Sequence, residues 1–194
     1  MTKKDILLNG IVVGSHDATG NTLEDAKAVE ALLKGKGLYK EVTKNDAMYN
    51  QACAFSSVAN DLYQRDLKKS PFKGTSVSPF IVNAVFSIEL YMKTIHNAYG
   101  NNIKGHHLVS LHKGMPKKGK EHFTSAANDI RNRYQLEINS DIHTCLASLN
   151  KAFEQWRYLY EHNQIGTELQ SIRYTMHAAH EACCRVREDC LNKK

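Results

Sequence analysis

Charged side chains interrupt two of the most apolar stretches of this chain, and they are the residues best suited to do chemistry. Residues 80–93, FIVNAVFSIELYMK, contain a glutamate and a lysine, and residues 153–162, FEQWRYLYEH, contain an arginine, a glutamate and a histidine. A charge on an apolar helix is costly to bury unless it meets an opposite charge or a ligand. We therefore expect one shared polar pocket, whose candidate catalytic residues are Glu89, Lys93, Arg157, Glu161 and His162.

Glu89 and Lys93 are four residues apart, so a helix places them on the same side. On a surface helix such a pair contributes roughly a few tenths of a kcal/mol. Glu89, however, lies between Ile88 and Leu90 in the most hydrophobic helix expected for this chain. Two interpretations stay open: a structural ion pair, or part of a functional site.

Arg157 and His162 have the side chains needed for metal-independent RNA cleavage. A histidine moves a proton for the 2′-hydroxyl or the leaving oxygen, and an arginine stabilises the charge on the phosphorane. A five-residue step on an ideal helix turns about 500°, which separates the two side chains by about 140°. They converge only if the helix ends near His162, which Asn163 and Gly166 favour. The alternative for Arg157 is pairing with Glu161 along the helix.

A second arginine–histidine set lies closer to the end of the chain. Arg173, His177 and His180 follow one another at i, i+4 and i+7, so they share one face of a helix. They are candidate RNA-binding residues, and the alternative is a polar face exposed to solvent.

Basic and histidine-rich segments outside these helices add candidate RNA contacts. Lys113 and Lys117 belong to a cluster of four lysines between residues 113 and 120, which indicates either phosphate contact or a solvated loop. His106 follows a glycine in an expected loop, where a histidine more often caps a helix or forms a hydrogen bond than acts in catalysis.

The composition is typical of a globular protein and excludes several classes of site. The chain has 194 residues, 42% hydrophobic and 24% charged, with a net charge of +6 and only 3 prolines. No unbroken apolar run approaches the ~20 residues that span a bilayer, so we expect no membrane association and a cytoplasmic location. The five cysteines form no C-x-x-C, and no H-E-x-x-H or paired Glu-x-x-His motif occurs. The sequence therefore predicts neither metal nor cofactor.

Hydrophobic spacing predicts helices over residues 22–34, 46–68, 79–98, 118–133, 141–162 and 167–191. The helix from residue 79 has the clearest apolar stripe, and Ser78 and Pro79 are expected to be its cap and first residue. In the helix from residue 46, we expect the apolar side to run through Ala47, Ala54, Val58, Leu62 and Tyr63. The segment 99–117 is expected to be a connection that packs on the core through its leucines.

The first residues have a different pattern. The short apolar pattern of residues 6–13 predicts a strand or a small hairpin with Asn9-Gly10 as its turn. The predicted fold class is all-α: an up-and-down helical bundle of about five to six helices with a small irregular or β-hairpin N-terminal extension. We place the extension at residues 1–45 and the bundle at residues 46–194.

Three segments resemble blocks found in the HEPN superfamily, a group of helical domains in prokaryotic toxins, antiphage systems and RNA-processing enzymes. SIELYMK (residues 87–93), GHHLVSLH (105–112) and FEQWRYLYE (153–161) are similar to the S-x-E-L-x-x-K, G-H-x-L-x-x-L and W-R-Y-x-Y-E blocks of HEPN-like proteins. Their order and spacing match as well as their residues.

The resemblance implies a core of four or five helices, a homodimer and a polar site at the dimer cleft. Active members carry an R-x(4–6)-H motif that cuts RNA without a metal. The pair Arg157 and His162 fits that spacing, and so does the pair Arg173 and His180. A tyrosine follows each arginine here, where active members often have Asn or Asp.

The first hypothesis is a HEPN-like RNA-binding protein or metal-independent ribonuclease in a defence or toxin–antitoxin setting. Arg157 would hold the scissile phosphate, His162 would be the general acid and base, and Glu89, Lys93 and Glu161 would position them. The expected partners are RNA, a second copy of the chain, and a cognate antitoxin or nucleotidyltransferase. The alternative is a non-catalytic helical module that binds a partner protein or a nucleotide.

Overall fold

The computed structural model describes residues 2–134, 140–150 and 168–191 of the chain. These residues belong to two units, Met1–Val42 and Thr43–Lys194. The first is a β-hairpin followed by a helix, and the second is an all-α, up-and-down helical bundle, as the sequence predicts.

The hairpin of the first unit consists of β1 (Thr2–Leu8) and β2 (Ile11–Ala18), paired antiparallel with an irregular step after Ile6. Its two-residue turn has φ of 51° at Asn9 and 81° at Gly10. An Asn-Gly pair is favoured there because hairpin turns of this type need a positive φ at both central residues.

Helix α1 (Thr22–Gly35) completes the first unit. Its N-cap is Asn21, whose side chain accepts a hydrogen bond from the Leu23 N–H. Gly14 lets β2 approach the helix closely, because a Cβ at that position would lie 2.9 Å from Leu32 Cδ2. Ile6 is the one hydrophobic residue buried within the described part of this unit, so its apolar core is small.

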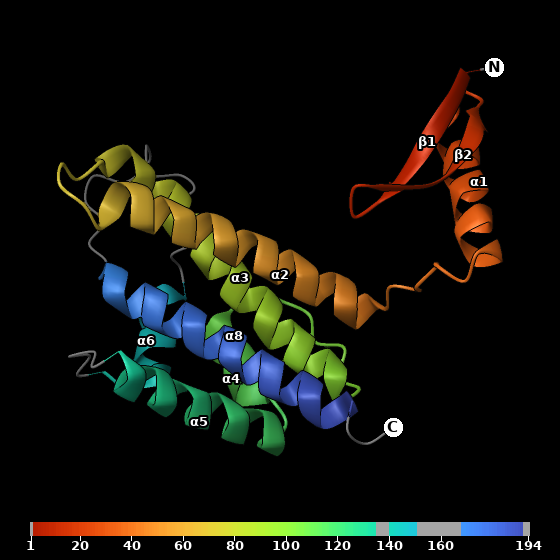
Figure 1. The fold of residues 1–194 in the computed structure, drawn as a ribbon. Coiled ribbons are helices and arrows are strands. Elements are labelled where there is room, and N and C mark those ends of the chain that lie inside the picture. Colours follow the sequence, from red (N-terminus) through yellow and green to blue (C-terminus); the bar gives the residue numbers. More distant parts are fainter. Residues whose placement is uncertain (1, 135–139, 151–167, 192–194) are drawn as a thin grey trace. The chain divides into compact units, whose positions relative to one another are not determined.

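The second unit is built around one central helix, α3 (Val77–Ala98). Helices α2 (Lys44–Leu62), α4 (Leu108–Gly114) and α8 (Leu169–Leu191) pack on α3. Helix α5 (Lys117–Arg133) packs on α8, and α6 (Ile142–Leu149) lies against α4 and α8. Figure 1 shows α2, α3 and α8 running side by side.

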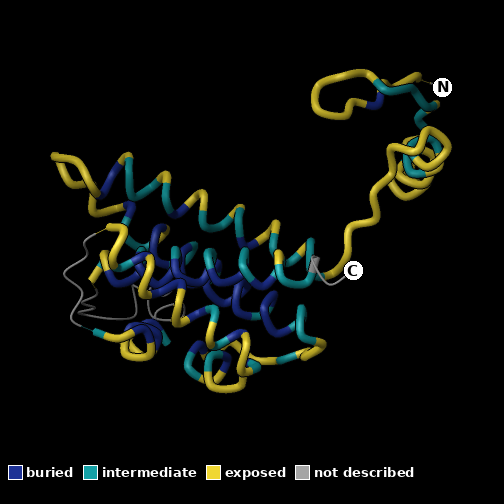
Figure 2. Tube along the Cα trace, turned by 60° about the horizontal axis from the view of Figure 1, so that its bottom comes forward, coloured by how far each residue is buried: buried dark blue, intermediate teal, exposed yellow. Residues whose placement is uncertain are grey.

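Burial confirms the apolar stripe expected for α3. Ile81, Ala84, Ile88 and Ile95 are fully buried, and α3 lies within the dark blue interior of Figure 2. The segment Gly74–Ala98 is, within the described residues, the one helix long and apolar enough to cross a membrane by length and composition. In its most apolar window 61% is buried inside the bundle, as expected of a core helix.

The apolar side predicted for the helix from residue 46 is wrong at its first three residues, whereas Leu62 and Tyr63 pack against the core as predicted. Ala47, Ala54 and Val58 face solvent, with Val58 47% exposed, whereas Ala52 and Ala59 are fully buried. The side of α2 that faces the core also carries Asn45, Tyr49, Ser56 and Asn60. The stripe was misassigned because polar residues occupy positions where a purely structural helix would have apolar ones.

Three element boundaries also differ from the prediction. Helix α3 begins at Val77, so Ser78 lies inside its first turn and is not the N-cap. The segment expected to be a connection contains α4, whose Leu108 and Leu111 are buried as expected. Helix α6 ends at Leu149, and the rest of the helix predicted from residue 141 lies outside the described residues.

The contact between α5 and α3 generates a stability prediction. A Cβ at Gly119 would lie 2.9 Å from Ile95 Cγ2 and 2.9 Å from Met115 Cγ. Gly119→Ala should therefore lower the free energy of unfolding by about 1–3 kcal/mol through overpacking. Urea denaturation measures this change. Gly74→Ala is the control, because its Cβ would meet only Phe72 at 3.9 Å; equal effects of the two variants would contradict the proposed contact.

Candidate functional site

Glu89 is the centre of a charged cluster on α3. Its side chain is almost fully buried, at 4% exposure. Its Oε1 accepts hydrogen bonds from Lys93 Nζ at 2.8 Å and from His106 Nδ1 at 2.9 Å. We call these three residues the Glu89 cluster. The structure thus brings together three of the site residues chosen from the sequence.

Backbone geometry after α3 places the histidine of this cluster. Gly105 has φ +95°, a conformation that glycine adopts without strain, directly before His106. The next residue, His107, is the N-cap of α4, and its Nδ1 accepts a hydrogen bond from the Ser110 N–H at 3.3 Å. The Asn150 side chain contacts His107 Nε2. His107 therefore has the capping role that the sequence left open for a histidine of this loop.

The Glu89 cluster has the geometry of an oriented proton acceptor. An ionised carboxylate only accepts hydrogen bonds, so Nδ1 of His106 carries the proton and Nε2 is free to accept one. The His106 side chain is 78% exposed, so Nε2 is accessible to solvent. A histidine held in this way can take a proton from a bound group. The same three residues also balance each other's charge, which keeps the structural interpretation of Glu89 and Lys93 open.

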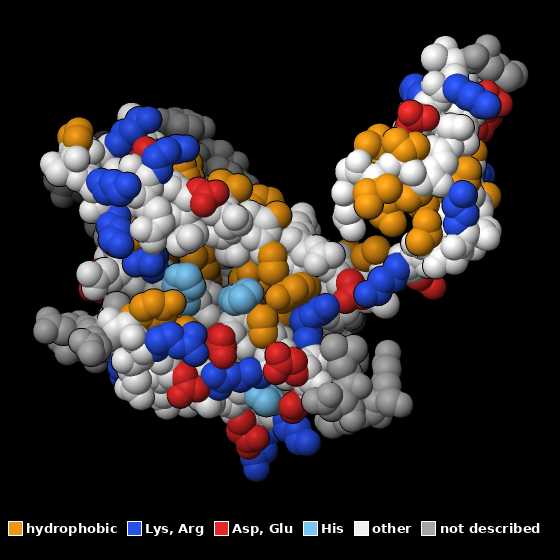
Figure 3. Space-filling view, viewed as in Figure 1, with side chains coloured by type: hydrophobic (Ala, Val, Ile, Leu, Met, Phe, Trp, Pro, Cys, Tyr) orange, Lys and Arg blue, Asp and Glu red, His pale blue; other side chains and the backbone are white. Residues whose placement is uncertain are grey.

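A second polar site lies along the α8 face that carries Arg173, His177 and His180. One cavity of about 300 Å³ lies between α2, α3 and α8, and another of about 310 Å³ lies where α8 meets α5 and the end of α2. His177 lines both cavities. We call the two cavities together the histidine cleft. Figure 3 shows histidine side chains in this hollow, with lysine and arginine side chains gathered at one end.

Aromatic rings hold the polar groups of the histidine cleft in place. The His180 ring lies 5.3 Å from the Tyr91 ring and 6.3 Å from the Tyr49 ring. Its Nε2 is 3.6 Å from Cys184 Sγ. The Arg173 guanidinium lies over the Tyr63 ring at 4.0 Å, a favourable cation–π contact. Tyr63 belongs to a short π-helical turn, Tyr63–Leu67, that follows α2.

Burial keeps the two histidines of the cleft uncharged. It lowers the pKa of His177 to about 4, with a smaller contribution from the positive charge of Arg173, and it also lowers the pKa of His180. Burial raises the pKa of the Tyr91 hydroxyl, which hydrogen-bonds to Ser56 Oγ at 2.9 Å. Arg173 Nε and His177 Nε2 are buried and have no hydrogen-bond partner within the described residues. At neutral pH the cleft therefore offers neutral imidazoles beside an arginine.

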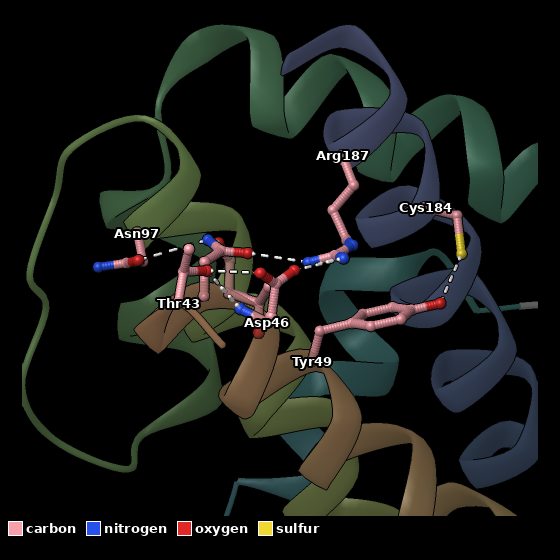
Figure 4. A network of polar contacts seen from close by, with 8 residues as sticks. Thr43, Asp46, Tyr49, Asn97, Cys184 and Arg187 are labelled. Atoms are coloured by element: carbon pink, nitrogen blue, oxygen red, sulfur yellow. Dashed lines mark hydrogen bonds and ion pairs between the residues drawn. The ribbon is translucent and has the colours of Figure 1, made fainter. Parts of the chain in front are cut away.

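A polar network fixes α8 against the beginning of α2. Arg187 donates to Asp46 Oδ1 at 2.8 Å and to Asn45 Oδ1 at 3.2 Å. Its guanidinium lies 4.2 Å from the Tyr49 ring, and the Tyr49 hydroxyl is 3.3 Å from Cys184 Sγ. Figure 4 shows these side chains pointing toward one another from the two helices. The network sets the separation of α2 and α8 along which the cleft lies.

Two of the remaining predicted site residues belong to neither the Glu89 cluster nor the histidine cleft. Lys113 and Lys117 are exposed at the junction of α4 and α5. The Lys117 side chain is 91% exposed and only 4.0 Å from Glu121, which fits the solvated interpretation of the lysine cluster. Arg157, Glu161 and His162 lie outside the described residues.

Sequence reasoning missed several residues of the histidine cleft. Asn60 and Tyr91 line one cavity, and Lys68 lines the other together with Arg173. The available signal was the run of polar residues on α2 at helical spacing, which includes Ser56 and Asn60.

The Glu89 cluster generates a stability prediction. Lys93→Ala removes the main positive charge from a carboxylate that is 4% exposed, so the free energy of unfolding should fall by about 3 kcal/mol. His106→Ala should cost less than about 1 kcal/mol, because that side chain is 78% exposed. Chemical denaturation of both variants tests the difference, and a larger loss for His106→Ala would contradict the arrangement.

The histidine cleft generates a pH prediction. The folded-state pKa of His177, about 4, lies below the unfolded value near 6.5, so the unfolded chain binds more protons as the pH falls from 6.5. Its contribution to stability is complete above pH 6.5 and is lost toward pH 4. Between pH 6.5 and 5, where carboxylates still titrate little, wild-type protein should lose about 2 kcal/mol through this residue. Urea denaturation of His177→Gln should show a shallower pH dependence, and an unchanged slope would contradict the burial of this imidazole.

The HEPN resemblance stays a prediction at this point. Its first two blocks form part of α3 and the His106 loop with α4, where they supply the Glu89 cluster. Its third block lies outside the described residues. Comparisons of the chain with protein-family models, with curated proteins and with solved structures found no match.

Proposed function

We propose that this protein is a HEPN-like RNA-binding protein that holds RNA in the histidine cleft and cuts it without a metal. The observation that carries the proposal is the pairing of Arg173 and His177 in one cavity, each with a buried nitrogen that lacks a partner within the described residues. Unpaired buried donors and acceptors are costly, and a bound phosphate and ribose hydroxyl would pair with them.

The chemistry assigned to these residues follows from their charge. Arg173 is cationic and would bind a phosphate oxygen and stabilise the negative charge that develops during cleavage. His177 is neutral at physiological pH because its pKa is about 4, so it has a lone pair for the proton of the 2′-hydroxyl. A bound phosphate beside it would raise its pKa and make it a stronger base. The 2′-oxygen would then attack phosphorus, and the departing 5′-oxygen would take a proton from water. The products would be a 2′,3′-cyclic phosphate and a 5′-hydroxyl.

The other parts of the hypothesis are proposals that rest on the resemblance. These are a homodimer, a defence or toxin–antitoxin setting with a cognate antitoxin or nucleotidyltransferase, and a cytoplasmic location. Arg157 and His162 remain the alternative catalytic pair.

A second candidate function is a non-catalytic helical module that binds RNA, a nucleotide or a partner protein. The balanced charges of the Glu89 cluster and the network around Arg187 favour this candidate, since both are polar groups that already have partners.

Incubation of purified protein with single-stranded RNA in excess chelator separates the candidates. The proposal predicts that wild type binds and cleaves RNA and that Arg173→Ala lowers both binding and cleavage by at least tenfold. Arg173→Lys keeps the charge but loses the planar fork and its contact with the Tyr63 ring, so it should lose less binding than Arg173→Ala but should not match wild type. Arg157→Ala is measured in parallel. Loss of cleavage in Arg157→Ala but not in Arg173→Ala would assign catalysis to the pair Arg157 and His162.

Folding controls keep the outcome interpretable. The Arg173 variants lose a contact with the Tyr63 ring, so their melting temperatures are measured with the activity. RNA binding without cleavage by wild type would favour the non-catalytic module. Absence of any RNA binding by folded wild-type protein would overturn the proposal.

A further inference from the structure

The two cavities of the histidine cleft differ in charge. The cavity between α2, α3 and α8 is lined by hydroxyl, amide, thiol, thioether and ring groups, and no Lys, Arg, Asp or Glu lines it within the described residues. The cavity beside α5 is lined by two cations, Lys68 and Arg173, and by no carboxylate of the described residues. We call them the neutral chamber and the cationic chamber. His177 stands at their junction.

The neutral chamber has the groups that recognise a planar, uncharged ring with polar edges. The His180 ring lines it and offers a surface for stacking, and the fully buried Tyr91 ring packs edge-on against His180 at 5.3 Å. The Asn60 amide lines it too and has no hydrogen-bond partner within the described residues. A free amide offers one acceptor and two donors, the combination that pairs with the edge of a nucleobase.

The Ser56 hydroxyl is a weaker candidate for base reading than Asn60. It already contacts the Tyr91 hydroxyl at 2.9 Å and the Cys53 carbonyl at 3.0 Å. Asn60 therefore has unused hydrogen-bonding capacity in this chamber, as do the Ser57 hydroxyl and His177 Nε2, and it is the one amide among the described lining residues.

The cationic chamber suits a phosphate. Arg173 and Lys68 place two positive charges there. Three carboxylates of neighbouring elements have partners of their own: Asp66 is paired with Arg65 and Ser76, Glu181 with Arg185, and Glu168 with Ser171. An anion in the chamber would meet both cations without a competing carboxylate on its lining.

The size of the chambers limits what they hold. Volumes of about 300 and 310 Å³ lie at the lower end of the range of about 300–1,000 Å³ for small-molecule sites. Each chamber therefore takes one chemical group of a chain and not a folded element. A base and its own phosphate are the neutral and anionic groups that a nucleotide joins through one sugar.

We infer that the histidine cleft binds one unpaired nucleotide of a single-stranded RNA, with the base in the neutral chamber against Asn60 and the phosphate in the cationic chamber between Arg173 and Lys68. This inference rests on the proposed RNA-binding function and deepens it. Base pairing would occupy the edge that Asn60 reads, so duplex RNA is excluded. Base preference and phosphate affinity then depend on different residues.

Fluorescence anisotropy with short labelled homopolymers tests the inference. Oligo(rA), oligo(rC) and oligo(rU) of eight nucleotides, and a blunt duplex of the same length, are titrated with wild-type protein in chelator at several salt concentrations. Wild type should bind its preferred homopolymer at least fivefold more tightly than the others and at least tenfold more tightly than the duplex.

Two substitutions separate base reading from phosphate binding. Asn60→Ala should reduce the difference between homopolymers to less than twofold and leave the salt dependence unchanged. Lys68→Ala should weaken binding to all homopolymers equally and lower the slope of log affinity against log salt by about 0.7, the value for one phosphate contact on a single strand. Asn60→Ser is a second substitution of the base-contacting residue and should show an intermediate loss of the preference between homopolymers.

Matched controls come from the same helix and turn. Asn50→Ala changes an exposed asparagine of α2, and Lys69→Ala removes the exposed lysine next to Lys68; neither lines the cleft, so both should bind like wild type. Equal binding of all homopolymers by wild type, or full base preference in a folded Asn60→Ala, would overturn the base-reading inference while RNA binding stood. Absence of RNA binding by wild type would overturn both.

Discussion

The burial of α3 is the constraint on which the rest of the bundle depends. A helix surrounded by other helices must provide a hydrogen-bond partner for every polar side chain that it carries. Ser87 and Thr94 solve this locally by donating to the carbonyls of Ala84 and Leu90. Longer side chains take partners from other elements, as the Tyr91 hydroxyl does from Ser56 on α2. On the side of α4, His96 Nε2 donates to the Leu111 carbonyl at 2.8 Å, and Glu89 accepts from His106 at 2.9 Å. Those two contacts fix α4 and the loop before it on the central helix, so the same polar residues both hold the fold and form a candidate site.

The packing of α8 on α3 is of another kind and leaves room for the histidine cleft. Ala178, Ala179 and Ala182 are fully buried, and small side chains let two helices approach closely. On the neighbouring face of α8 the side chains are large and polar, and α2 meets them with Tyr49, Ser56 and Asn60 in place of aliphatic residues. The interface between α2 and α8 is therefore held by polar contacts and ring contacts. It contains cavities that closely packed aliphatic side chains would fill.

Much of the fold follows from sequence spacing, and part of the candidate site does. The stripe of α3 and the Asn9-Gly10 turn were predicted because each depends on residues close in sequence. The i, i+4 pair Glu89 and Lys93 and the shared face of Arg173 and His177 were predicted for the same reason. The inward face of α2 was not, because its polar residues have partners on α3 and α8 that are distant in sequence. The hydrogen bond between Glu89 and His106 was not predicted either. It depends on the conformation of the loop that contains Gly105, and the spacing of apolar residues gives no information about a loop conformation.

The hydropathy of α3 has a consequence for how the chain emerges from the ribosome. Helix α2 is synthesised before α3 and can cover one side of it at once, whereas α8 is synthesised after every other described helix. At about 5–20 residues per second, the ribosome needs some seconds to make the chain between Ala98 and Leu169. During that interval α3, which is long and apolar enough to enter a bilayer, lacks its contact with α8 on one side. That side of α3 stays uncovered by α8 until Leu169–Leu191 has been synthesised.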